Sequence, residues 1–196
     1  FSLCASSVYI TNDLLDLESD RAHPRKKNRP FATARLSIAF GIVAVPLLIG
    51  ASIAIGKFLG SAFLLVLLVY LLLTVMYTLV LKRLVLVDCL VLATLYTVRI
   101  IAGAVAVSVT LSFWMLTFSV FIFLSLALLK RYAELKVQMQ EGKSTAHGRG
   151  YMVSDAPLLQ IFGASSGYIS ALVIALYVRS KDIVSLYAKP YGIWLV

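Results

Sequence analysis

The chain has 196 residues, a mean hydropathy of +0.94 and only 14% charged residues. A soluble domain carries about 25% charged residues, so this composition excludes an ordinary soluble protein. The net charge of +9 would suit a nucleic-acid partner, but the basic residues lie between long apolar runs. That distribution is typical of a membrane protein, and we expect membrane lipids and no nucleic acid as partners.

Four runs of the chain contain no Asp, Glu, Lys or Arg: 36–56, 58–81, 100–129 and 156–178. Each run is long enough to cross a hydrocarbon core, which takes about 20 apolar helical residues. We divide the run 100–129 near 105–112, where Ser and Thr cluster. The predicted fold is therefore an all-α, polytopic transmembrane bundle. Its predicted elements are a partial span over 1–12, full spans over 36–56, 60–81, 85–107, 111–131 and 156–178, and a further span from about 187.

The termini lie inside apolar stretches, which suggests a fragment of a larger protein that is truncated at both ends. We treat residues 1–196 as a single membrane domain. Thirteen Lys and Arg residues fall in the segments 12–35, 82–83 and 130–149, against four at the opposite ends of the spans. This asymmetry predicts a multi-pass protein of the inner or plasma membrane, with these three segments facing the cytoplasm.

The first polar segment begins with NDLLDLESD, residues 12–20, which holds four of the nine acidic residues of the chain. If this stretch continues the first helix, Asp13, Asp16 and Asp20 fall on one face, with Asn12 at its edge. Three carboxylates on one face repel one another unless a cation lies between them, and oxygen ligands suit Mg²⁺. The basic residues that follow, Lys27 and Arg29 among them, would neutralise a diphosphate.

The alternative is that these charges are solvated groups at the membrane surface, which set topology and attract anionic lipids. That alternative explains the basic residues well. It does not explain three aspartates on one face, because acidic residues contribute little to topology.

The pattern N-D-x-x-D-x-x-x-D followed by R-P, here Asn12, Asp13, Asp16, Asp20, Arg29 and Pro30, resembles the first signature of the UbiA superfamily of intramembrane prenyltransferases. The resemblance implies that Asp13, Asp16 and Asp20 are catalytic Mg²⁺ ligands. It also implies a chain that runs from about the second helix to the start of the eighth of an expected nine. An isoprenoid lipid and a diphosphate-bearing donor are the implied substrates, and the existence of a homo-oligomer is left open.

The second polar segment reads KRYAELKVQMQEG, where aromatic-acceptor members of that superfamily typically carry D-x-x-x-D. The strings ESDRAHPRKKNRPFA, LYTVRIIAGAVA and LALLKRYAEL look more like the branch of polyprenyl-phosphate phosphoribosyltransferases. The resemblance therefore favours transfer of 5-phosphoribose from phosphoribosyl diphosphate to a polyprenyl phosphate. The alternatives are an aromatic-acceptor prenyltransferase and, more distantly, a cation transporter.

Candidate substrate-binding residues accompany these motifs. They are Asn12, Lys27, Arg29, Arg99, Lys130, Arg131, Tyr132, Glu134, Arg149, Tyr151 and Asp155. Arg99 lies inside a predicted span, where a charged side chain needs a partner, either a substrate phosphate or a carboxylate of another helix. Asp88 lies about 16 Å away along the same helix, too far for a direct pair. Lys130 and Arg131 also suit anchors at a helix end, and Glu134 is spaced to pair with Lys130.

Overall fold

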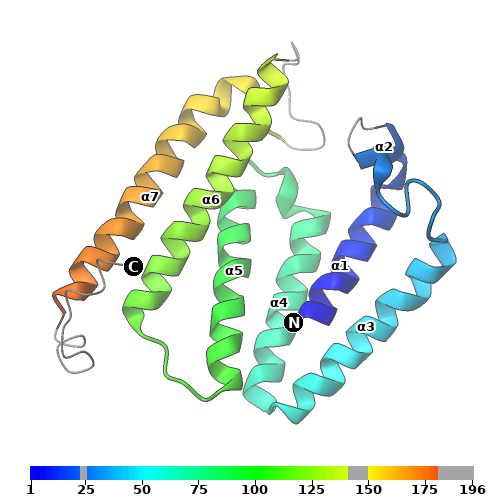
Figure 1. The fold of residues 1–196 in the computed structure, drawn as a ribbon, viewed down its shortest axis with the longest axis horizontal. Coiled ribbons are helices and arrows are strands. Elements are labelled where there is room, and N and C mark those ends of the chain that lie inside the picture. The colour runs from blue at the N-terminus through cyan, green and yellow to red at the C-terminus, as the bar shows by residue number, and fades with distance from the viewer. Residues whose placement is uncertain (23–25, 141–149, 181–196) are drawn as a thin grey trace. The chain divides into compact units, whose positions relative to one another are not determined.

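The computed structural model of the chain describes residues 1–22, 26–140 and 150–180. Within these ranges the regular elements are helices, and no strand occurs (Figure 1). Five helical segments are long and apolar enough to cross a membrane: Ile38–Phe58, Ser61–Leu79, Val87–Ala106, Phe113–Gln140 and Val153–Val178. The predicted all-α membrane fold is confirmed, and the span predicted from about 187 lies outside the described residues.

The chain divides into two compact units, of which the N-terminal unit covers Phe1–Thr78 with Val105–Val107. It contains α1 (Ser2–Leu15), the short α2 (Leu17–Ala22), the 3-10 turn η1 (Lys26–Asn28), α3 (Ile38–Phe58) and most of α4 (Ser61–Leu79). Helices α1 and α3 pack together closely at Gly41. A Cβ at Gly41 would lie 2.9 Å from a methyl carbon of Leu14 and 3.1 Å from the Phe31 ring. This tight packing fixes the chain on both sides of the first polar segment.

The C-terminal unit covers Leu79–Ala104 and the residues from Ser108 onward. Its elements are η2 (Leu81–Arg83), α5 (Val87–Ala106), α6 (Phe113–Gln140), η3 (Val153–Asp155) and α7 (Ala156–Val178). Helices α6 and α7 pack along their length (Figure 1). Gly163 and Gly167 form a G-x-x-x-G stripe on α7, and the Ser125 hydroxyl donates to the Gly163 carbonyl at 2.7 Å. Small residues of this kind let membrane helices approach closely.

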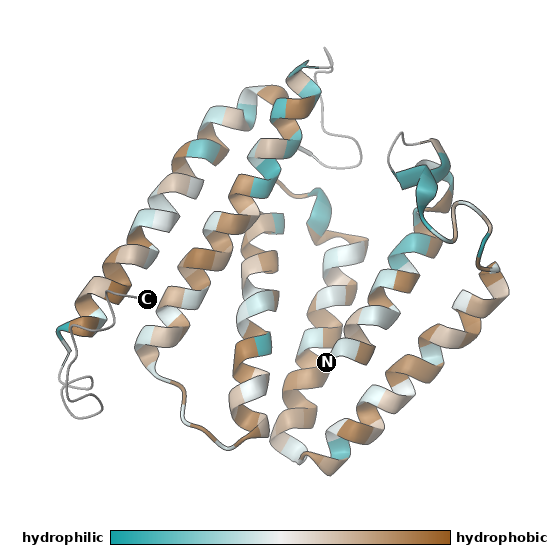
Figure 2. Cartoon of the chain, in the orientation of Figure 1, coloured by the Kyte–Doolittle hydropathy of each residue, from teal (hydrophilic) through white to brown (hydrophobic). Residues whose placement is uncertain are grey.

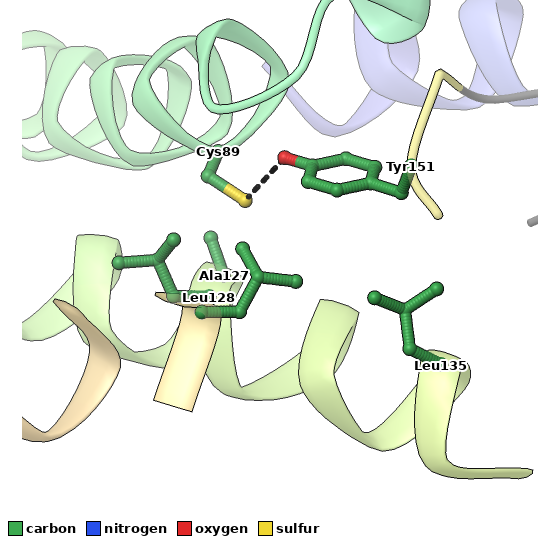
Figure 3. Close-up of a cluster of buried hydrophobic side chains, with 6 residues drawn as sticks. Cys89, Ala127, Leu128, Leu135 and Tyr151 are labelled. Atoms are coloured by element: carbon green, nitrogen blue, oxygen red, sulfur yellow. Dashed lines mark hydrogen bonds between the residues drawn. The ribbon is translucent and has the colours of Figure 1, made fainter. Parts of the chain in front are cut away.

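A buried cluster ties α5, α6 and α7 to the chain segment that precedes α7. It consists of Cys89, Ala127, Leu128, Leu135, Tyr151 and Leu159 (Figure 3). The Tyr151 ring enters this apolar cluster, and its hydroxyl lies 3.6 Å from the Cys89 sulfur. The cluster therefore positions a tyrosine hydroxyl beside the start of α5.

The structure departs from the sequence-based picture at two places: the condition that would put the three aspartates on one helical face is not met, and one span was predicted too short. The first helix does not continue unbroken through the aspartates: α1 ends at Leu15, Asp16 is its C-cap with φ −94° and ψ 11°, and α2 starts at Leu17. Helix α6 does not end near residue 131 but continues to Gln140. Figure 2 shows hydrophilic residues gathered on α2 and on the C-terminal part of α6, whereas the spans are mostly hydrophobic.

Candidate active site

The first polar segment brings two of its three aspartates onto one arginine. Arg29 Nη1 donates to Asp13 Oδ1 at 2.8 Å and to Asp20 Oδ2 at 2.7 Å. Asp13 comes from the last turn of α1 and Asp20 from α2, so the helix break at Asp16 lies between them. We call Asp13, Asp20 and Arg29 the Arg29 cluster. Charge-assisted hydrogen bonds of this kind are roughly twice as strong as neutral ones.

The backbone around Arg29 is fixed by local contacts. The Arg29 N–H donates to the Lys26 carbonyl at 2.9 Å, and the Thr33 N–H donates to the Arg29 carbonyl at 2.9 Å. Two residues after Arg29, the side chain of Phe31 is buried against Gly41 of α3. The buried phenyl ring therefore anchors the turn that carries the guanidinium.

Two buried side-chain oxygens of the first polar segment accept no hydrogen bond from the described residues. Asp20 is only 1% exposed, and its Oδ1 accepts no hydrogen bond from the described residues, with Lys26 Nζ 3.9 Å away. The buried Asn12 Oδ1 likewise has no hydrogen-bond partner within those residues. Buried oxygens without donors are costly unless something else binds them. Carboxylate and amide oxygens of this kind are the ligands that hard divalent cations prefer.

The charge state of Asp13 reflects its environment. Asp13 lies just beyond the predicted partial span 1–12, and burial raises its pKa above the ordinary value. Arg29 opposes this rise, while Asp20 and Asp16 add to it. Within the described part of the chain, no three His, Cys, Asp or Glu side chains are arranged to bind a metal ion together. Arg29, rather than a third carboxylate, completes the group.

A second charged cluster lies in the C-terminal unit and is centred on Asp88, near the start of α5. Arg131 Nε donates to Asp88 Oδ2 at 2.6 Å, and Arg131 Nη1 donates to a Glu134 carboxylate oxygen at 2.6 Å. The Tyr151 hydroxyl donates to Asp88 Oδ1. Asp88, Arg131 and Tyr151 are all at most 2% exposed. We call these four residues the Asp88 cluster.

The backbone around Tyr151 is adapted to this cluster. The Leu86 N–H donates to the Tyr151 hydroxyl at 2.8 Å, and Leu86 has a φ of +65°, which is unusual for a leucine. A Cβ on the neighbouring Gly150 would lie 2.6 Å from the Arg83 carbonyl oxygen, so only glycine fits there. Burial, followed by the hydrogen bond to Asp88, raises the pKa of Tyr151. The phenol therefore stays protonated and can donate to the carboxylate.

The other described residues predicted for the site differ in exposure and in contacts, and they belong to neither cluster. Lys27 and Lys130 are exposed, and Asp16 is half-buried. Tyr132 borders a hollow of about 240 Å³ between α6 and α7. The Asp155 carboxylate accepts from the Met152 N–H at 2.8 Å, so it stabilises the turn before α7. Arg149 lies outside the described residues.

Two expectations about charge pairs can be compared with the geometry. Glu134 binds Arg131, whereas its spacing in the sequence had indicated Lys130 as its partner. The Arg99 guanidinium carbon lies 5.1 Å from the centre of the Tyr96 ring, on the same helix. This cation–π contact is one stabilising interaction of a charge within a span.

The sequence did not identify Asp88 as part of a site. The sequence feature that could have revealed Asp88 is its place as a single acidic residue at the start of an apolar span, where an ionisable side chain usually has a specific partner. Its partner Arg131 follows 43 residues later, and nothing in the spacing connects the two. Lys26, which lies near Asp20, was also not singled out among its basic neighbours.

Comparison with known proteins identifies the family. The family model described as the UbiA prenyltransferase family matches residues 1–195. The chain is 38% identical to the uncharacterized protein y4nM of Sinorhizobium fredii, over 100% of this chain and 40% of that protein. It is 34% identical to the nodulation protein NoeC of Azorhizobium caulinodans, over 93% of this chain and 60% of that protein.

A third relative carries a biochemical name. The chain is 37% identical to the decaprenyl-phosphate phosphoribosyltransferase of Mycolicibacterium smegmatis, over 72% of this chain and 45% of that protein. The chain therefore spans between 40% and 60% of the length of these relatives. The match over almost the whole chain, together with the five apolar helices, leads to one conclusion: the chain belongs to the UbiA prenyltransferase family.

Proposed function

We propose that the protein transfers 5-phosphoribose from phosphoribosyl diphosphate to the phosphate of a polyprenyl phosphate. The similarity to a decaprenyl-phosphate phosphoribosyltransferase supports this substrate class. One structural observation favours it over an aromatic acceptor. Among the described residues in and around the second polar segment, Asp88 and Glu134 are engaged with Arg131, and Asp155 with the Met152 N–H; Glu141 lies outside the described residues.

This observation matters because the aromatic-acceptor reading requires a second pair of acids to bind another Mg²⁺. Both carboxylate oxygens of Asp88 already accept hydrogen bonds, from Arg131 and Tyr151, whereas Asp20 Oδ1 in the first segment has no donor within the described residues. Asp88 is therefore a poor candidate for that role. The exposed Lys130, near the start of the same segment, is instead suited to an anionic substrate. The segment is therefore better matched to phosphate than to a second metal.

The residues of the first segment would bind the diphosphate of the donor. No three acids of the described residues already form a metal site, so Mg²⁺ would be held by Asp13 and Asp20 together with phosphate oxygens, with Asp16 and Asn12 as further candidate ligands. The Asp20 oxygen without a donor fits that role. When bound, Mg²⁺ would neutralise charge on the departing diphosphate. Arg29 and Lys27 would donate to phosphate oxygens, and Arg29 suits this task because its guanidinium matches phosphate geometry.

The reaction needs little acid–base chemistry from the protein. A phosphate oxygen of the acceptor attacks the anomeric carbon of the ribose, a C–O bond forms, and the bond to the diphosphate breaks. The acceptor oxygen is already ionised, so no strong general base is required. The role of the protein is to hold both anions together and to offset their charge.

The test is a donor and acceptor screen with the purified protein in detergent or nanodiscs. We expect label from ribose-labelled phosphoribosyl diphosphate to enter the lipid phase only when polyprenyl phosphate and Mg²⁺ are present. A prenyl diphosphate with an aromatic acceptor serves as the competing pair. Product from that pair, with none from the sugar donor, would contradict the proposal and leave the family unchanged. Labelled cation uptake into proteoliposomes that Asp13→Ala abolishes would instead support a transporter.

A further inference from the structure

Arg29 bridges the two carboxylates of the Arg29 cluster through a single nitrogen. A single nitrogen, Nη1, lies 2.8 Å from Asp13 Oδ1 and 2.7 Å from Asp20 Oδ2. This nitrogen bridges two carboxylates that come from two helical segments. The Asp20 carboxylate is almost fully buried. A cation shared by these two carboxylates would have to lie at nearly the same point.

Mg²⁺ binds carboxylate oxygens at about 2.0–2.1 Å and demands near-octahedral geometry. The guanidinium and a bridging metal ion cannot both lie between the same two oxygens, and their like charges also repel. We propose that Arg29 and the divalent cation compete for Asp13 and Asp20. A diphosphate ends this competition because its oxygens accept hydrogen bonds from Arg29, which leaves the two carboxylates to the cation. This inference rests on the proposed function and adds an order of binding to it.

The rest of the cluster supports the competition. Arg29 binds Asp20 through Oδ2 and leaves Asp20 Oδ1 without a hydrogen bond from the described residues, so it satisfies only part of the acceptor set. A cation with several coordination positions can also bind the second oxygen of Asp20, which the two contacts of Nη1 leave unused. The acceptors are therefore better matched to the metal once Arg29 has another anion to bind.

The energetic reason for the order is electrostatic. A metal ion that arrives alone must displace a guanidinium from two charge-assisted hydrogen bonds, and the guanidinium gains nothing in return. A metal that arrives with a diphosphate brings phosphate oxygens, which the guanidinium binds as well as it binds carboxylates. Metal and diphosphate should therefore bind with positive coupling, of about 5–150-fold in affinity.

The experiment measures binding and not turnover. Mn²⁺ replaces Mg²⁺, pyrophosphate replaces the donor, and bound Mn²⁺ is measured by equilibrium dialysis at matched free Mn²⁺. We expect pyrophosphate to raise the Mn²⁺ affinity of the wild-type protein by about 5–150-fold. Arg29→Gln should bind Mn²⁺ alone at least about 10-fold more tightly than wild type, and its coupling to pyrophosphate should shrink.

The matched control is Arg35→Gln, which removes an exposed arginine of the same polar segment and should behave like wild type. Adding Asp20→Asn to Arg29→Gln should cancel the gain, because it removes the shared carboxylate. If Arg29→Gln does not fold, Arg29→Lys provides the same comparison, with a smaller gain expected from an ammonium that keeps the charge.

The possible outcomes separate the inference from the proposed function. If wild type takes up Mn²⁺ with pyrophosphate while neither Arg29 variant gains affinity for Mn²⁺ alone, the competition is wrong and the proposed function stands. If wild type binds no Mn²⁺ even with pyrophosphate, both are wrong. Tighter Mn²⁺ binding by the variant, cancelled by Asp20→Asn, supports both.

Discussion

Lys130 and Arg131 are adjacent in the chain but have opposite environments. The Lys130 side chain is exposed, whereas Arg131 is 2% exposed and binds both Asp88 and Glu134. Removing one partner of a buried ion pair leaves an uncompensated charge and costs about 3–5 kcal/mol. We therefore expect Arg131→Ala to lower the free energy of unfolding by that amount. Lys130→Ala should unfold like wild type but show a raised KM for phosphoribosyl diphosphate.

The measurement is denaturant unfolding of the purified variants, followed by circular dichroism, beside steady-state kinetics. Asp88→Ala provides the control for the pair. The double variant Asp88→Ala with Arg131→Ala should be less destabilised than the sum of the single variants, because the second change removes the stranded charge. Additive effects would show that the two side chains do not stabilise the fold as a pair.

Asp13 gives a prediction about pH. Its folded pKa is raised above 3.8, so the fold favours the protonated form relative to the unfolded chain. Its contribution to stability is therefore fully present below pH 3.8 and is lost as pH rises through the folded pKa. In Asp13→Asn this loss should be absent. As the pH rises from 3.8 through the folded pKa of Asp13, the free energy of unfolding of the variant should therefore fall less than that of the wild type. Parallel pH profiles of the two unfolding midpoints would contradict the prediction.

Protons should also compete with the metal at Asp13. A raised pKa means that the carboxylate takes up a proton at a higher pH than an ordinary aspartate does. We expect Mn²⁺ binding to weaken on acidification already above pH 3.8. Asp13→Asn should bind Mn²⁺ at least about 10-fold more weakly at neutral pH, since even the loss of an outer-shell partner has an effect of that size. Equilibrium dialysis across the pH series tests both statements. Wild-type affinity in the variant at neutral pH would exclude Asp13 as a ligand.

At the scale of elements, the apolar spans were predictable because hydropathy decides them. The ends of α3, α4, α5 and α7 lie within two residues of the predicted ends. The end of α6 was predicted too early, because the apolar run stops before Lys130. The helical period continues nonetheless: Leu128, Arg131 and Leu135 are all buried at helical spacing. A charged residue on the buried face concealed this pattern.

The pairs within the site could not be predicted for a different reason. Asp13, Asp20 and Arg29 lie within one short segment, and the sequence placed them in one site. The contact of Arg131 with Asp88 joins two helices across 43 residues, and a single sequence carries no information about such a pairing. The break at Asp16 was missed because neither Pro nor Gly marks it.

The segment before α7 gives a prediction at this scale. A Cβ at Gly150 would lie 2.6 Å from the backbone oxygen of Arg83, and backbone cannot yield as a flexible side chain does. Gly150→Ala should therefore move Tyr151 away from Leu86 and Asp88, and lower the free energy of unfolding by about 1–3 kcal/mol. The control is Gly103→Ala in α5, where nothing lies within 4 Å of the new Cβ. Equal stability of the two variants would show that the segment adjusts freely.

At the scale of the whole molecule, the charge asymmetry predicts topology. Ser19 and Ser154 should face the cytoplasm, and Ser61, at the start of α4, should face the other side. All three residues are exposed, and both native cysteines are buried, so single cysteine substitutions report cleanly. An impermeant maleimide added to intact cells should label Ser61→Cys and spare Ser19→Cys and Ser154→Cys. The reverse labelling pattern would invert the proposed orientation of the site.

The pairing of Asp88 with Arg131 also has a consequence for biosynthesis. Asp88 is synthesised 43 residues before its partner, which at about 5–20 residues per second is a delay of roughly 2–9 s. During that interval α5 leaves the ribosome with a carboxylate whose buried partner does not yet exist. The insertion machinery must therefore hold α5, or leave its first turn in water, until α6 has been translated. Ribosome-bound chains that end before Arg131 should accordingly have α5 less firmly integrated than chains that extend beyond it.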